Sequence, residues 1–202
     1  MNDCREIVLY FNNGSKLVPV DIAKSLSDRF KDLGNPLVLN PEGSSIQPLV
    51  VFRENASMMI TMTQMTINMI IDGTYFDKMD TIIFDLVDLF NDMDIKFTKL
   101  GIVYSIFLSG KHKEIVKEKL LDSSIIPNDI LEFNVAFYRQ LGLKKEKINC
   151  WERLITNTEK FDDLLVQFDI NTDTNPVRDI NMKYIREFIK LADEYSEERI
   201  DF

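Results

Sequence analysis

The chain has 202 residues, of which 45% are hydrophobic and 28% are charged, a balance typical of one folded domain and not of a disordered chain. Lysine and arginine number 24 against 33 aspartates and glutamates, a net charge of −9, which argues against binding to nucleic-acid phosphates or to an anionic membrane surface. No apolar stretch reaches the ~18 residues of a membrane-spanning helix and no secretory signal opens the chain, so we expect a cytoplasmic protein.

The first elements alternate between strand and helix. The apolar run over residues 6–11 predicts a strand. Pro19 suits the first turn of a helix, and two short strands are predicted after it, at 37–39 and 49–52. The helix has one apolar stripe at steps of four, four and three residues: Ile22, Leu26, Phe30 and Leu33.

Residues 58–71 alternate as a strand does, but the apolar parity switches between Thr63 and Gln64. Either a β-bulge flips the faces, or both faces are covered and parity does not matter. The bulge is the interpretation we favour. No charged residue lies between Glu54 and Asp72, so this segment is also a candidate edge strand. It is either covered by the second half of the chain or used to pair two chains as a homodimer.

A strong amphipathic helix and a long strand follow. The helix is predicted over residues 76–90. The strand over residues 95–108 is apolar on both sides, which is typical of a central strand covered on both faces.

The second half is predicted to contain three helices and a hairpin. A charged helix is expected over 112–121, and a second helix over 130–141. Strands at 148–156 and 164–170 then form the hairpin, before a last helix with the stripe 185–192. The second helix has an apolar stripe that ends before Gly142: Ile130, Phe133, Phe137 and Leu141.

These elements predict an α+β fold, a mainly antiparallel sheet with helices packed on it. Residues 1–109 are expected to form a ferredoxin-like β-α-β-β-α-β unit. Residues 110–202 form an α-α-β-β-α half, and whether it extends the same sheet is left open. No linker is long enough to separate two domains, so the chain is treated as one domain, 1–202.

No motif for dinucleotide, phosphate-loop or zinc-protease chemistry is present. His112 is the only histidine, which weakens acid–base catalysis by histidine. Asp85 and Asp88 lie one helical turn apart and could share a cation or an acid role, although a solvated acidic face explains them equally well. We therefore assign no catalytic residue and no cofactor.

One string resembles a calcium loop, with oxygen ligands at its first, third, fifth and seventh positions: Asp169, Asn171, Asp173 and Asn175. Its sixth position is Thr174 instead of glycine, and its twelfth is Ile180 instead of glutamate. The turn and the bidentate ligand are both lost, and these residue types also favour ordinary turns. We therefore expect no metal.

The two cysteines, Cys4 and Cys150, lie within strand-like sequence and form no CxxC pair. We interpret them as buried thiols in a reducing compartment. A disulfide between them remains an alternative at this stage.

Several strand segments resemble a family of uncharacterised bacterial proteins described as sporadically distributed. They are the opening strand at 6–11 and the segments at 47–52, 66–68, 99–104 and 166–170, together with the helix start at Tyr75-Phe76. The sequence departs from the family at Lys99 and Val103, where the family often has arginine on each side of Leu100-Gly101. The family has no established activity, so the resemblance implies a fold and no mechanism.

By elimination, the sequence favours a non-enzymatic binding or interaction protein that acts through a protein partner and is encoded by a phage or another mobile element. One alternative is an acidic inhibitor that mimics DNA. The other is an enzyme that uses scattered carboxylates, for which the candidates are Asp85, Asp88, Asp169 and Asp173. An open sheet face would favour the partner hypothesis, and a pocket with paired carboxylates would favour the enzyme.

Overall fold

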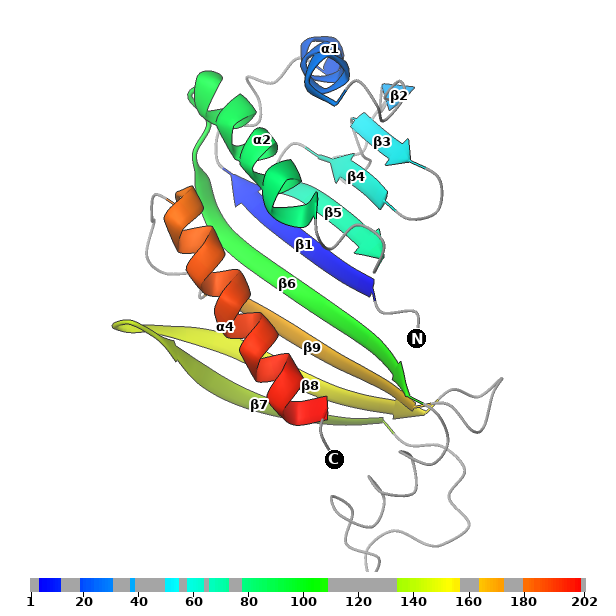
Figure 1. Cartoon of the computed structure of the whole chain (residues 1–202), viewed down its shortest axis with the longest axis vertical. Coiled ribbons are helices and arrows are strands. Elements are labelled where there is room, and N and C mark those ends of the chain that lie inside the picture. Colours follow the sequence, from blue (N-terminus) through cyan, green and yellow to red (C-terminus); the bar gives the residue numbers. More distant parts are fainter. Residues whose placement is uncertain are drawn as a thin grey trace, which may run out of the picture.

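A computed structural model describes residues 4–11, 19–30, 37–38, 50–54, 58–63, 66–72, 78–108, 134–156, 164–172 and 180–200. Within these residues the chain forms one antiparallel sheet of nine strands, and helices α2 and α4 lie across one of its faces (Figure 1). The helices are α1 (Pro19–Arg29), α2 (Met79–Asp92) and α4 (Met182–Ile200). The strands are β1 (Cys4–Phe11), β2 (Leu37–Val38), β3 (Val50–Glu54), β4 (Met58–Met62), β5 (Thr66–Asp72), β6 (Phe97–Leu108), β7 (Asn134–Leu143), β8 (Glu146–Thr156) and β9 (Leu164–Thr172).

The strands follow the order β2-β3-β4-β5-β1-β6-β9-β8-β7. The α+β class and the antiparallel sheet are as predicted, and β6 is the interior strand expected from residues 95–108, between β1 and β9. The predicted hairpin of β8 and β9 and the closing helix α4 are also confirmed. The second half therefore extends the sheet of the first half.

The ferredoxin-like unit predicted for residues 1–109 is wrong. Between α1 and α2 the chain forms four strands, β2 to β5, and each pairs antiparallel with the next. β5 and β6 flank β1 and both run antiparallel to it, so α2 connects two parallel strands across an intervening one. A ferredoxin-like unit has two consecutive strands between its helices, whereas this chain has four antiparallel strands there.

The parity switch at Thr63 is a chain reversal and not a β-bulge. Residues 58–62 and 66–72 are separate strands that pair with each other. The amide of Thr63 donates to the carbonyl oxygen of Thr66 at 2.9 Å, and the amide of Thr66 donates to the Thr63 hydroxyl at 3.0 Å. Both strands are interior, so the edge predicted for this segment is also wrong: the edges of the sheet are β2 and β7.

The helix predicted over residues 130–141 is contradicted from Asn134 onward, because Asn134–Leu143 is strand β7. Phe137 and Leu141 are four residues apart, a spacing that places side chains on one side of both a helix and a strand. Pairing with β8 decides in favour of the strand. The turn between β7 and β8 includes Lys144, whose φ is 57°, and neither glycine nor asparagine occupies this position to indicate a turn in the sequence. The helix predicted at 112–121, and His112 within it, lie outside the described residues.

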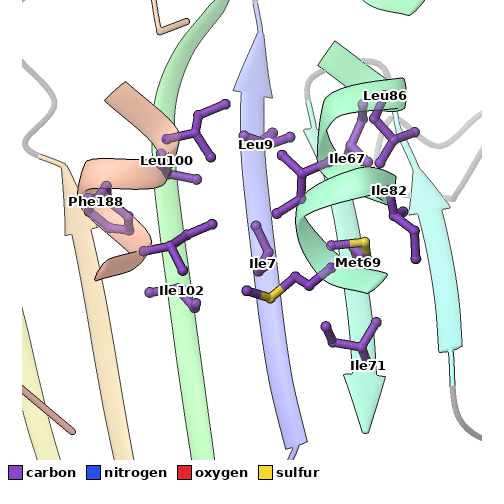
Figure 2. Close-up of a cluster of buried hydrophobic side chains, with 14 of the residues drawn as sticks. Ile7, Leu9, Ile67, Met69, Ile71, Ile82, Leu86, Leu100, Ile102 and Phe188 are labelled. Carbon is purple, nitrogen blue, oxygen red and sulfur yellow. The ribbon is translucent and has the colours of Figure 1, made fainter. Parts of the chain in front are cut away.

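The core lies between the sheet and the two long helices. In Figure 2, Ile7 and Leu9 of β1 and Leu100 and Ile102 of β6 point toward the layer that contains Phe188 of α4 and the apolar side of α2. All of these side chains are buried. Three aromatic rings close one end of this core: Phe11, Phe90 and Phe97, with centroids 5.5 to 6.3 Å apart.

The opposite face of the sheet is covered by no described helix or strand. Val103 is half-buried and Phe107 is 44% exposed, although both lie on the central strand. The expectation that β6 is covered on both faces therefore fails within the described residues. We call this second surface the open face; it consists of the outward residues of β5, β1, β6, β9, β8 and β7.

The helices give no indication of a membrane span. No described helix combines the length with the apolarity that crossing a bilayer requires.

Candidate functional site

Gly101, in the middle of β6, forms the floor of a hollow on the open face. Its register neighbours are Val8 of β1 and Asn171 of β9. A Cβ at Gly101 would lie 3.6 Å from the Cβ of Asn171, an ordinary contact, so neither crowding nor backbone strain demands glycine here. What glycine provides is space: the hollow has a volume of about 360 Å³. Its lining residues are Val8, Tyr10, Lys99, Leu100, Gly101, Val103, Asn149, Asp169, Asn171 and Thr172.

One side of the hollow is polar, and its side chains form a chain of hydrogen bonds across β7, β8 and β9. The Tyr138 hydroxyl donates to Oδ1 of Asn149 at 2.7 Å. Nδ2 of Asn149 then donates to Oδ1 of Asn171 at 3.4 Å, and Nδ2 of Asn171 donates to Oδ1 of Asp169 at 3.0 Å. The chain ends on a carboxylate and holds each amide in one orientation, which is how a preorganised binding surface is built.

The other side of the hollow is apolar. Val8 and Val103 form this wall. The Lys99 ammonium lies 5.6 Å from the centroid of the Tyr10 ring, a cation–π contact that keeps the charge at the rim. A group with an apolar body and a polar edge therefore matches the hollow better than a fully charged one.

Exposed aromatic rings are concentrated on the open face, and one of them, Tyr10, lines the hollow. Six large hydrophobic side chains are exposed among the described residues, and four of them lie on the open face: Tyr10 at 41%, Phe107 at 44%, Tyr138 at 49% and Trp151 at 40%. Tyr138 and Trp151 contact each other, with ring centroids 5.0 Å apart. Large rings concentrated on one surface are typical of a contact surface, since scattered single ones would need no explanation.

The open face does not share the acidity of the chain. Its described charged side chains are three cations and two carboxylates: Lys99, Lys147, Arg153, Glu6 and Asp169. Helix α2, on the far side of the sheet, contains four aspartates and no basic residue. The negative charge is therefore segregated away from the surface that carries the aromatic rings.

The candidate carboxylates do not assemble into one site. Asp88 of α2 accepts a hydrogen bond from Arg29 at 2.8 Å, and Asp85 lies on the same helix, whereas Asp169 lies on the open face. The sheet separates the two sets, and Asp173 lies outside the described residues. Among the described candidates, Asp169 therefore shares no site with Asp85 or Asp88.

The calcium-like string is described only in part. Asp169 and Asn171 lie in β9, where they hydrogen-bond to each other. Asp173 and Asn175 lie outside the described residues. In the part of the chain that is described, no three histidine, cysteine, aspartate or glutamate side chains gather as metal ligands would.

The two cysteines form no disulfide with each other; Cys150 is buried as predicted, whereas Cys4 is only partly buried. Cys4 lies on the open side of β1, whereas Cys150 lies on the helix side of β8, with β6 and β9 between these strands, so they cannot form the disulfide left open above. Burial raises the pKa of the Cys150 thiol to about 11, and burial likewise raises the pKa of Tyr195 above it to about 12. A thiol protonated at neutral pH is a poor nucleophile, so this pair does not form a reactive site.

Sequence reasoning singled out Asp169 but missed Gly101, Asn149, Trp151 and the hollow itself. A glycine inside an otherwise apolar strand was the available signal, because it often marks a close approach of a ligand or another chain. Comparison of the sequence with models of protein families and with curated proteins finds no match.

Proposed function

We propose that the protein is a non-enzymatic binding protein that acts through a protein partner docked on the open face of the sheet. The observation that carries this proposal is the concentration of Tyr10, Phe107, Tyr138 and Trp151 on one uncovered surface of the described residues. Tyrosine and tryptophan are the residue types most enriched among the energetic anchors of protein interfaces.

The dimensions of the face suit a protein partner. Six strands, from β5 to β7 in the sheet order, span roughly 29 Å at about 4.8 Å per strand, and about eight residues along each span roughly 26 Å. The resulting area, on the order of 750 Å², matches the ~800 Å² that each partner buries in a standard interface.

The acidic alternatives have less support. A DNA mimic needs a continuous row of unpaired carboxylates. In α2, however, Asp88 and Asp92 lie 2.8 and 3.8 Å from Arg29, and Asp80 lies 3.7 Å from Arg186 of α4. The enzyme alternative is weakened because the sheet separates Asp169 from Asp85 and Asp88. Two cysteines that are not joined to each other also suit the cytoplasmic location that we propose.

The experiment that tests this function compares two exposed aromatic positions, one on the open face and one on helix α2. A photo-reactive phenylalanine analogue is placed at Tyr138 on the open face or at Phe84, which is 46% exposed on α2, and crosslinked in the native host. The species captured only from position 138 is then purified and titrated against the parent and against Trp151→Ser and Phe84→Ser.

We expect Trp151→Ser to weaken binding about tenfold or more, as loss of an interface anchor does, and Phe84→Ser to leave it unchanged. Equal binding of the parent and Trp151→Ser, or capture only from position 84, would contradict the proposal.

A further inference from the structure

We propose that the partner which fits the open face is a second copy of the same chain, and that Trp151 of each copy packs against the Gly101 hollow of the other. This inference rests on the function proposed above and names its partner. It replaces the homodimer expected through residues 58–71, which are interior in the sheet.

The face is complementary to itself when the two-fold axis runs along the strands, midway between β6 and β9. In the order β1-β6-β9-β8, this axis places β1 of one copy over β8 of the other, and β6 over β9. Glu6 of β1 then faces Trp151 of β8, and Arg153 lies two residues further along the same strand, close enough for its long side chain to approach Glu6. Because the contact is two-fold, each pairing occurs twice, as an isologous interface requires.

The same axis brings Trp151 to the hollow. Trp151 shares a cross-sheet row with Glu6, since both align with the pair formed by Val103 and Asp169. With β8 over β1, the indole of one copy meets the apolar wall formed by Val8 and Val103 in the other. The missing Cβ of Gly101 leaves room there, and an amide oxygen of the polar side can accept a hydrogen bond from the indole N–H.

Charge distribution favours this face over the helix side. Each chain carries a net charge of −9, and two copies repel wherever their acidic surfaces approach. Joining through the open face leaves the four aspartates of α2 on the outer surface of both copies. The described charged side chains brought together at the interface are then of both signs, six cations and four carboxylates, so pairing does not bring two acidic surfaces together.

The first test measures mass in solution by sedimentation equilibrium for the parent and three variants. We expect a dimer for the parent and for Phe84→Ser, and dissociation constants about tenfold or more higher for Trp151→Ser and for Gly101→Leu, which fills the hollow. Circular dichroism and thermal melts confirm that each variant is folded. A folded, monomeric parent overturns the inference, and so does a dimer that Trp151→Ser leaves intact.

The second test fixes the axis. Glu6→Arg alone and Arg153→Glu alone each bring like charges close together across the interface and should weaken the dimer, whereas the double variant restores opposite charges at these two positions and should recover it. Failure of the double variant to recover, with both singles weakened, overturns the proposed axis.

The experiments distinguish the proposed self-pairing from the proposed binding function. A monomeric parent whose heterologous partner still depends on Trp151 overturns the self-pairing and leaves the proposed function standing. A monomeric parent with no Trp151-dependent partner overturns both.

Discussion

Arg29 of α1 and Asp88 of α2 tie the two helices together. Nη1 of Arg29 donates to Oδ2 of Asp88 at 2.8 Å and to the backbone oxygen of Asp85 at 2.9 Å. The acidic pair that the sequence offered as a cation or acid site is therefore, for Asp88, a docking point for α1.

Removing this tie should destabilise the protein modestly. Arg29→Ala loses a partly exposed ion pair and a hydrogen bond to a carbonyl, which together contribute about 1 kcal/mol. We expect a melting temperature lower by a few degrees. The control is Lys190→Ala, which removes an exposed ion pair with Glu194 at 3.6 Å and should change the melting temperature little. Equal changes in the two variants would show that the contacts of Arg29 with α2 do not stabilise the fold.

Ile102 and Val103 are adjacent in β6 but face opposite sides of the sheet. Ile102 is fully buried, whereas Val103 is half-buried on the open face. Ile102→Asp places an unpaired charge in the core and should reduce the free energy of unfolding by several kcal/mol, and Val103→Asp should cost much less. Urea denaturation measures both, and similar losses would mean that the faces are assigned wrongly.

Gly101→Ala should not destabilise the protein. The added Cβ meets Asn171 at an ordinary 3.6 Å, and alanine loses less conformational entropy than glycine within a strand, so we expect a gain of about 0.5 kcal/mol in the free energy of unfolding. Chemical denaturation measures the change. A clear loss of stability would show that the floor of the hollow is packed and not open.

Stability should fall at alkaline pH partly because of Cys150. Its pKa is raised from 9.0 to about 11 in the folded state, so the folded protein holds the proton more tightly than the unfolded chain. The corresponding stability is fully present below pH 9 and is lost as the pH rises toward 11.

Cys150→Ala removes this contribution. We therefore expect the free energy of unfolding of the parent to fall more steeply than that of Cys150→Ala, by on the order of 1 kcal/mol near pH 10. Denaturant unfolding at several pH values makes the comparison, which cancels the lysines and the tyrosines that do not interact with Cys150; Tyr195 does interact with it. Parallel curves would contradict the assigned cause.

Calcium should not stabilise the protein. Asp169 already accepts a hydrogen bond from Asn171 within β9, and a cation bound only by the folded state would raise the melting temperature. We expect identical melts with millimolar calcium and with a chelator. A calcium-dependent rise that Asp169→Ala abolishes would revive the string from Asp169 to Asn175 as a ligand set.

Local periodicity in the sequence determined the helices α1, α2 and α4 and the strands β6, β8 and β9, because each has a long apolar pattern that fits only one period. The pattern failed at Thr63 and over residues 134–143. Both places involve hairpin turns without glycine, and in β7 the spacing of Phe137 and Leu141 fits a strand as well as a helix.

Only the tertiary structure decided the candidate site. Asn149, Asp169 and Gly101 come from three strands, and the register of β8 with β9 and of β9 with β6 places them around one hollow. Tertiary structure also separated the acidic helix from the neutral, aromatic face, which overall charge cannot reveal. Strand order depends on contacts between residues far apart in the chain, and hydrophobic periodicity records only which side of its own element a residue occupies.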